Sequence, residues 1–302
     1  MKHSILAVVS ALSCVAVCVA CSSSSNKGSG GPGDGGSGEG GVGDGGAGDS
    51  GGDGGSSGGS LPYFGSLAAS RTASGLYTIA GDFFATPDAG TPTACPSPSV
   101  LSGSCCYTPP AVASDAGASD AGTLALVSAG VITFTDGTTP LAAISPGTDG
   151  AYAVGSDKNV TVKWTPGDKI TVSAAGDVVK AFTGSLTTVD DIAGVTPALS
   201  LTTEATVPIA SNLDVTWTAG NATSMVVLLT AVKGKAGDGS ILCDVADSAG
   251  TVSVPTALLS KLTTGDVGTI TLTRSTVTTV TGSNATVELV GTATASGLLK
   301  YQ

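Results

Sequence analysis

Apolar and polar residues alternate in short runs through most of the chain, a period of two that is typical of β-strands with one buried face. The runs recur about every 8 to 12 residues and are separated by turns rich in Gly, Asp and Pro. One short helix is predicted over Thr256–Leu262, after Pro255. The pattern predicts an all-β fold, an immunoglobulin-like or related β-sandwich, over residues 61–302. The predicted strands are Leu76–Ala80, Val131–Thr135, Val160–Trp164, Ile170–Ala174, Val178–Phe182, Leu213–Thr218, Met225–Leu229, Thr251–Val254, Thr269–Thr273 and Thr286–Val290.

Two segments of the chain are alike: Asn159–Gly167 and Asn212–Gly220 each place alternating apolar residues before a tryptophan and a glycine turn. They contain both tryptophans of the protein, Trp164 and Trp217. Since the alternation puts each indole on the apolar side of its strand, we expect both to be core anchors. A flat platform for a sugar or another ligand is the alternative. The copies are close together for complete immunoglobulin-type domains, which favours one sandwich with duplicated halves over two small ones.

The N-terminus has a different pattern, an apolar or small-residue run over 5–20 that follows Lys2. Such a run is typical of a secretory signal peptide and is too short to be interpreted first as a membrane-spanning helix. It ends in Cys18-Val19-Ala20-Cys21, which resembles the lipobox of bacterial lipoproteins, although Cys18 stands where leucine is usual. The resemblance implies a signal peptide over 1–20, cleavage between Ala20 and Cys21, and acylation of Cys21.

Other interpretations of this end stay open. Cys14 and Cys18 are rival lipidation sites, but Val17 is large for the position before the cysteine, and Cys14 would leave a very short apolar run. An ordinary signal peptide that releases the protein, or an uncleaved anchor, is a further alternative. An acylated Cys21 implies attachment to a lipid bilayer without a spanning segment. Ser22, in place of aspartate, implies the bacterial outer membrane, with the protein facing the periplasm or the cell surface.

Two segments are too poor in apolar residues to build a core. Residues 21–60 are roughly half glycine, with serine and aspartate, so a disordered and flexible tether is predicted. For about 40 Gly-rich residues, the root-mean-square span is roughly 35 Å. A Pro-, Ala- and Gly-rich region at about 85–122 is predicted to be a surface insertion into the β domain.

With Cys21 assigned to lipid, the exported chain keeps Cys95, Cys105, Cys106 and Cys243. An even number of cysteines in an oxidising compartment indicates two disulfides. Adjacent Cys105 and Cys106 would close a strained ring, so Cys95 is expected to pair with one of them and Cys243 with the other. A four-thiolate zinc or iron–sulfur site is the alternative, but adjacent cysteines do not match the Cys-x-x-Cys spacing of such sites. We predict no metal and no cofactor.

The composition argues against several kinds of catalytic and binding site in the domain. The only histidine is His3, inside the predicted signal peptide, so the mature chain would have none for a catalytic triad or a His-based zinc site. The formal net charge is −11 and the 12 Lys and Arg residues are scattered, which disfavours nucleic acid as a partner. The sequence therefore predicts a protein that is not an enzyme.

Paired carboxylates leave one catalytic alternative, a polysaccharide-degrading hydrolase, because glycosidic bonds can be hydrolysed by two acids across a cleft. Asp190 and Asp191 are more simply explained as part of a solvated loop, or at most of a calcium site. The candidate acids are Asp190, Asp191, Glu204, Asp214 and Glu288.

The layout as a whole resembles a set of uncharacterised lipoproteins from gliding soil bacteria of the myxobacterial type. The resemblance implies no activity. The predicted function is therefore a non-catalytic binding or structural β domain, held at the bilayer through Cys21, with an envelope protein or a glycan as partner. The resembling segments are the lipobox, the Gly-Asp tether, Gly103-Ser104-Cys105-Cys106, Trp164-Thr165-Pro166-Gly167-Asp168, Val178-Val179-Lys180-Ala181-Phe182, and Ile241-Leu242-Cys243-Asp244 to Val254-Pro255.

Overall fold

The structure, a computed structural model, describes residues 61–85, 95, 99–110, 125–155, 162–232 and 239–302. The predictions on Ala20, Cys21, the signal peptide and the tether lie outside these residues. Within them, no helix is long and apolar enough to cross a membrane.

Strands rich in Thr, Val and Ala form one ten-stranded sheet at the centre of the fold. The strands are β1 (Tyr63–Thr72), β2 (Tyr77–Ala85), β3 (Val100–Ser102), β4 (Cys105–Thr108), β7 (Tyr152–Gly155), β10 (Ala205–Val207), β12 (Ser224–Val232), β13 (Gly239–Val245), β15 (Val267–Thr281) and β16 (Ala285–Tyr301). Their order is β3-β4-β13-β12-β15-β16-β1-β2-β7, and β10 pairs with β16 beside this path. The strands β1 and β10 run parallel to β16, whereas the other neighbours are antiparallel.

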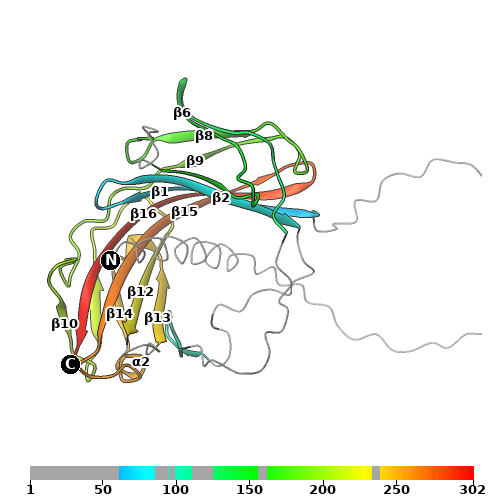
Figure 1. Cartoon of the computed structure of the whole chain (residues 1–302). Helices are drawn as coiled ribbons and strands as arrows, with labels where there is room; N and C mark the ends of the chain where they lie inside the picture. The colour runs from blue at the N-terminus through cyan, green and yellow to red at the C-terminus, as the bar shows by residue number, and fades with distance from the viewer. Residues whose placement is uncertain (1–60, 86–94, 96–98, 111–124, 156–161, 233–238) are drawn as a thin grey trace, which may run out of the picture.

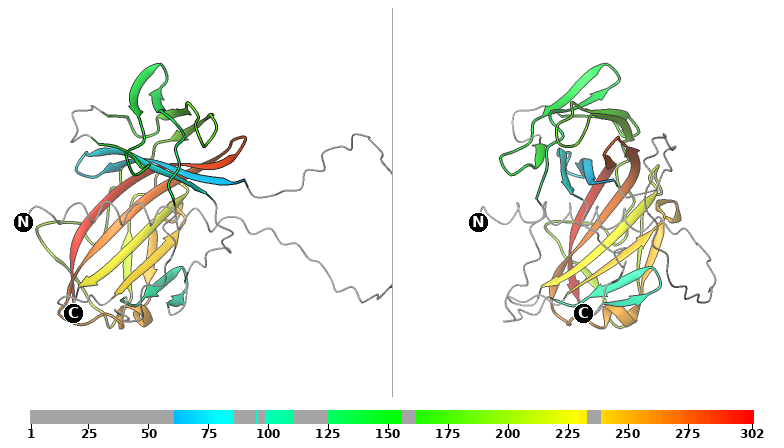
Figure 2. Two further views of the ribbon diagram at one scale, coloured as in Figure 1. Left: turned by 45° about the vertical axis from the view of Figure 1, so that its right-hand side comes forward. Right: turned by 90° about the vertical axis from the view of Figure 1, so that its right-hand side faces the viewer.

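Two smaller sheets complete the fold. The first has the order β6-β5-β8-β9 and consists of β5 (Ile132–Asp136), β6 (Thr139–Ile144), β8 (Lys169–Ala174) and β9 (Phe182–Thr187). The second pairs β11 (Leu213–Thr216) with β14 (Thr251–Val254), next to the 3-10 turn η1 (Asp247–Ala249) and the helix α2 (Thr256–Leu259). Figure 1 shows the four-stranded sheet above β1 and β2, with α2 at the opposite end of the molecule, and the views in Figure 2 agree.

Two separate hydrophobic cores lie on the same face of the large sheet, because alternate residues of each strand point to one side. The first core joins β1, β2 and the start of β16 to the four-stranded sheet and includes Leu67, Ile79 and Leu289. The second joins β12, β13, β15 and the end of β16 to β11, β14 and α2 and includes Leu229 and Leu299. The predicted all-β sandwich is confirmed, with unequal layers: one long sheet is shared by two cores.

Both tryptophans are core residues. Trp164 belongs to the first core and Trp217 to the second, and each is 5% exposed. The Trp164 ring meets Tyr77 edge-on, with 4.7 Å between ring centroids. The two similar sequence segments therefore each supply one core with an aromatic anchor, and the alternative of an exposed ligand platform is wrong.

Two predicted strands are absent from the described residues. Residues 162–164 of the predicted strand Val160–Trp164 lie in no strand, and its first two positions fall outside the described residues. The second is the predicted strand Val178–Phe182, of which only Phe182 lies in a strand, as the first residue of β9. The residues before Phe182 form a loop, although Val179 is buried. The Asn284 side chain explains this loop, because its amide accepts from the Lys180 N–H and donates to the Val178 carbonyl in place of a neighbouring strand.

The predicted surface insertion contributes an ordered hairpin. Its strands β3 and β4 extend the large sheet, with β4 pairing to β13. Both predicted disulfides are present, Cys95–Cys106 and Cys105–Cys243. The second bond links the hairpin to β13 across a sequence separation of 138 residues.

Candidate binding face

The face of the large sheet that points away from both cores is lined by hydroxyl groups. Threonine suits such a surface, because β-branched side chains fit an extended strand. In the centre, Thr273 of β15 lies opposite Thr294 of β16, and one residue pair further along the same face Ser275 lies opposite Thr292. We call this surface the hydroxyl face and define it by Ser70, Thr72, Thr78, Ser224, Thr230, Ser240, Thr269, Thr271, Thr273, Ser275, Thr292, Thr294 and Ser296.

Hydrogen bonds between side chains of neighbouring strands tie this face together. The pairs are Thr292–Ser70 and Thr230–Thr269, at 2.8 Å between oxygens, and Thr271–Ser296 and Ser224–Ser275, at 3.1 Å. Each hydroxyl has one donor and two acceptor lone pairs, so a pair that shares one hydrogen bond still offers a donor and several acceptors. The face is therefore pre-ordered, and its partly exposed hydroxyls, such as those of Ser70 and Thr230, keep hydrogen-bonding capacity for a further polar molecule.

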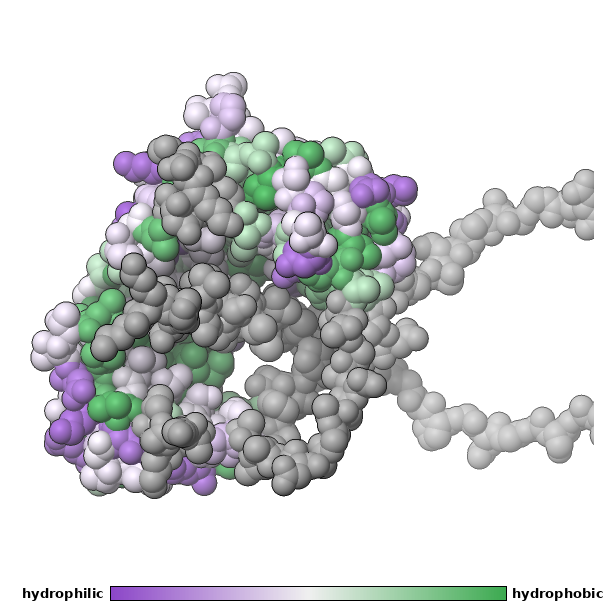
Figure 3. Space-filling view, in the orientation of Figure 1, coloured by the Kyte–Doolittle hydropathy of each residue, from purple (hydrophilic) through white to green (hydrophobic). Residues whose placement is uncertain are grey.

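Every residue that the large sheet contributes to the two cores lies on the side opposite the hydroxyl face. The centre of the hydroxyl face is buried, with Thr273, Ser275, Thr292 and Thr294 6 to 9% exposed, whereas members nearer its margin, such as Ser70, Thr78 and Thr230, are partly exposed. The strands β15 and β16 are strongly curved. As a result, the part of the sheet that contains β1 and β2 lies at a steep angle to the part that contains β12 and β13 (Figure 1). The hydroxyl face lies on the inner side of this curve. In the same view, Figure 3 shows hydrophobic and hydrophilic residues interspersed over the described surface. Apolar side chains such as Val290 and Leu242 lie among the hydroxyls, so the surface is mixed.

Three carboxyl groups with altered acidity share this face. Burial raises the pKa of Glu288 on β16, which is 8% exposed and whose Oε2 atom has no hydrogen-bond partner among the described residues. Burial also raises the pKa of Asp82 on β2, and the negative charge of Asp149 raises it further. On β13, burial raises the pKa of Asp244, while a hydrogen bond from Ser224 opposes this shift.

Two of these acids lie in one row across three strands, next to an aromatic pair. Asp82 is opposite Ser66 of β1, and Ser66 is opposite Glu288 of β16. The neighbouring row on the same face pairs Phe84 with Phe64, whose tilted rings are 5.4 Å apart between centroids. We call these four side chains, Asp82, Glu288, Phe64 and Phe84, the acidic end of the hydroxyl face.

The structure does not bring the predicted hydrolase acids together. Asp190 exchanges hydrogen bonds with Asn221: the Asn221 backbone N–H donates to the Asp190 carboxylate, and the Asp190 backbone N–H donates to the side-chain Oδ1 of Asn221. Asp191 pairs with Arg71 at 3.0 Å. Glu204 and Asp214 are exposed on other segments. Only Glu288 lies on the hydroxyl face.

The residues that sequence reasoning missed are Asp82, Phe64 and Phe84. The alternation in Tyr77–Ala85 places Asp82 and Phe84 on one side of a strand, which was a usable signal for β2. Nothing in the sequence identifies β16 as the second neighbour of β1.

A buried ion pair stabilises the junction between the two cores. Arg274 on β15 is 1% exposed and Asp247 in η1 is 0% exposed; the Arg274 Nε donates to Asp247 at 3.0 Å. The remaining guanidinium nitrogens donate to the carbonyls of Thr218, Asp190 and Asp191. Asp247 also accepts from the Trp217 indole and from the Gly220 N–H. Every polar group of this pair is used internally, so the pair is structural.

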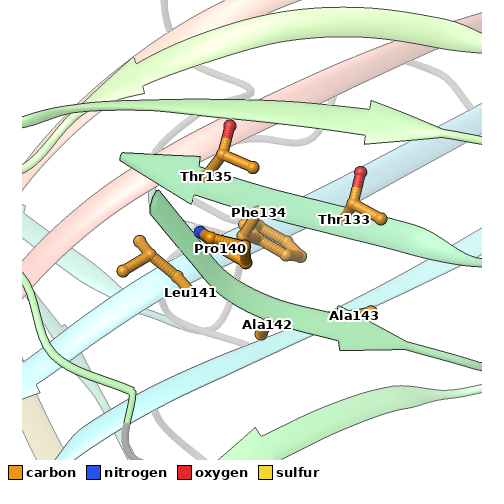
Figure 4. A pocket seen from close by; sticks show the side chains of 7 residues that line it. All are labelled: Thr133, Phe134, Thr135, Pro140, Leu141, Ala142 and Ala143. Atoms are coloured by element: carbon orange, nitrogen blue, oxygen red, sulfur yellow. The ribbon is translucent and has the colours of Figure 1, made fainter. Parts of the chain in front are cut away.

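A shallow pocket on the β5–β6 hairpin offers no chemistry. Its lining is apolar apart from threonines, and Phe134 points into the first core while Thr133 and Thr135 point away from it (Figure 4). No titratable side chain lines the pocket. Among the described residues, no group of three or more His, Cys, Asp or Glu is placed to hold a metal ion.

No family model matches the chain, and no curated protein matches it.

Proposed function

We propose that the protein is a membrane-anchored lipoprotein, displayed at the outer membrane, whose β domain binds a glycan through the hydroxyl face without cleaving it. The observation that carries this proposal is a curved sheet face, on the side away from both cores, whose hydroxyls are ordered by hydrogen bonds across neighbouring strands and are partly exposed towards its margin, as at Ser70 and Thr230. Glycan hydroxyls donate and accept hydrogen bonds just as Ser and Thr side chains do, so the two surfaces are chemically matched.

Other partner classes fit this face less well. An extended peptide binds most readily at a sheet edge, where main-chain groups are free, and not on a sheet face. Nucleic acid is disfavoured by the net charge of −11. The small, partly exposed apolar side chains between the hydroxyls, such as Ala68 and Ala80, suit the apolar faces of sugar rings.

Binding to purified envelope polysaccharides tests the glycan proposal. We expect the double variant Ser70→Ala/Thr292→Val of the full chain to bind about tenfold more weakly, because each lost hydrogen bond contributes roughly 1 kcal/mol. Removing both partners of the pair leaves no orphaned hydroxyl, so the fold should be retained. Affinity is measured by titration calorimetry, and thermal unfolding checks the fold.

The matched control is Ser173→Ala/Thr183→Val, which removes an equivalent cross-strand hydroxyl pair from the four-stranded sheet. It should bind like the parent. The proposal is wrong if no polysaccharide binds, or if both double variants bind as the parent does. Release of reducing sugar that is lost in Glu288→Gln would instead favour the hydrolase.

The anchoring part of the proposal depends on Cys21. We expect the protein to incorporate labelled palmitate and to fractionate with membranes, and Cys21→Ser to abolish both, because two or more acyl chains are needed for stable attachment. The variants Cys14→Ser and Cys18→Ser remove the rival sites and should behave like the parent. A Cys21→Ser protein that is still labelled and membrane-bound would contradict the proposal.

A further inference from the structure

We infer that the acidic end of the hydroxyl face binds a protonated amine of the glycan, so that the ligand is an amino-sugar polymer with free amino groups. This inference rests on the proposed glycan binding and adds the identity of one recognised group.

Glu288 lacks the partner that a buried carboxylate needs. It is almost fully buried, and its Oε2 atom has no hydrogen-bond partner in the described part of the chain. An ionised carboxylate in such a place is costly unless it meets a cation or a set of donors. Its cross-strand neighbours on this face are Ser66 and Thr279, neither of which carries a charge. A cationic ligand group would supply the missing partner.

The described cations lie elsewhere. Arg71 and Arg274 point to the opposite side of the sheet, where they pair with Asp191 and Asp247. On the hydroxyl face itself, the four strands that surround Glu288 carry one cation, Lys300, at the far end of β16. The field at the acidic end is therefore negative and complements a positively charged ligand.

The spacing of the acids suits one sugar-borne amine. Adjacent strands are about 4.8 Å apart, so the backbone positions of Asp82 and Glu288 are separated by about 10 Å, with the Ser66 hydroxyl between them. An ammonium has three donors, so it can donate to one carboxylate and to the Ser66 hydroxyl, while the charge of the second carboxylate adds to the attraction. The charge of Asp149 beside Asp82 adds to the attraction.

The aromatic pair supports the same ligand. Phe64 and Phe84 are half-buried and lie one row away on the same face, about 7 Å along the strands. Aromatic faces attract both ammonium groups and the apolar faces of sugar rings. Beyond the acidic end, Thr78, Ser70 and Thr292 continue the surface with hydroxyls. Acidic, aromatic and hydroxyl side chains thus occur together on one surface. This combination favours a polyhydroxylated chain that carries an amine over an isolated cation.

Oligomers of glucosamine, N-acetylglucosamine and glucose of equal length test the inference. We expect the full chain to bind the glucosamine oligomer about tenfold more tightly than the acetylated one, because charge-assisted hydrogen bonds are stronger than neutral ones. This preference should shrink as salt is added, since the acidic end is partly open to solvent.

Two variants test whether the acidic end causes the preference for the glucosamine oligomer. Glu288→Gln and Asp82→Asn should each bring the affinities for the glucosamine and the acetylated oligomer to within about threefold of each other. Asp214→Asn, which neutralises an exposed acid on β11, is the matched control and should keep the full preference. Thermal unfolding verifies each fold, and Glu288→Gln is expected to be at least as stable as the parent at neutral pH because no unpaired charge is buried.

The outcomes separate the two proposals. Equal affinity for all three oligomers, or a preference unchanged in both Glu288→Gln and Asp82→Asn, would overturn the amine inference and leave glycan binding standing. Failure of every oligomer and polysaccharide to bind would overturn glycan binding itself.

Discussion

Replacing Arg274 by methionine is expected to lower the free energy of unfolding by about 3 to 5 kcal/mol, the usual cost of removing one partner from a buried ion pair. Methionine keeps much of the volume but removes the guanidinium that neutralises Asp247 and binds the carbonyls of Thr218 and Asp191. The segments that contain Asp191, Thr218 and Asp247 would lose the hydrogen-bond donor that they share. Urea unfolding followed by tryptophan fluorescence measures the effect, since Trp217 donates to the same Asp247.

The matched control is Arg71→Met, which breaks the partly exposed pair with Asp191. Exposed pairs contribute about 0 to 1 kcal/mol, so this variant should be nearly as stable as the parent. An Arg274→Met protein that loses no more stability than Arg71→Met would show that the buried pair does not stabilise the junction.

Removing the Cys105–Cys243 disulfide is expected to destabilise the protein by about 5 kcal/mol, because its loop of 138 residues strongly restricts the unfolded chain. The change is the double variant Cys105→Ala/Cys243→Ala, and the measurement is the same urea titration.

The double variant Cys95→Ala/Cys106→Ala opens a loop of only 11 residues, and the same chain-entropy relation gives about 3 kcal/mol. This pair is the control for loss of a disulfide as such. Equal losses in the two double variants, or a larger loss for Cys95 and Cys106, would contradict the loop-length argument.

The sequence predicted the fold class well where strands bury one face and expose the other. Leu213–Thr218 and Thr251–Val254 alternate clearly, and they correspond to β11 and β14. The long strand β16 was predicted only over Thr286–Val290, because the Gly, Thr, Ala and Ser residues that follow are small and include no strongly apolar side chain. That part of the strand is buried without being strongly apolar, so alternation could not reveal it.

The strand β1 was missed for a related reason, since its centre is built from small residues. Gly65 lies against the Phe83 ring, and a Cβ atom at this position would overlap the ring. Small side chains therefore satisfy the packing here, although they weaken the hydrophobic pattern. The same strand brings Ser66 beside Glu288, so missing it also hid the acidic end of the candidate site.

The hydroxyl face could not be predicted, because it depends on pairing between strands that are far apart in the sequence. The hydrogen bond between Ser70 and Thr292 joins residues 222 positions apart, and no local signal specifies such a partner. Cysteine chemistry was predictable at similar range because few thiols were available to pair. The hydroxyl face had dozens of Ser and Thr residues to choose from, and only the strand order selects those that share it.

The parallel pairing of β1 with β16 has a mechanical consequence. In a protein held at the membrane through Cys21, as proposed, a pull on a bound polymer reaches the anchor through the N-terminal end of β1. This strand is paired with β16 along its whole length and with β2 on its other side. The pull acts along the strand, so the hydrogen bonds on both sides carry the load together in shear instead of opening one after another. The attachment point thus lies where the domain should best resist being torn apart.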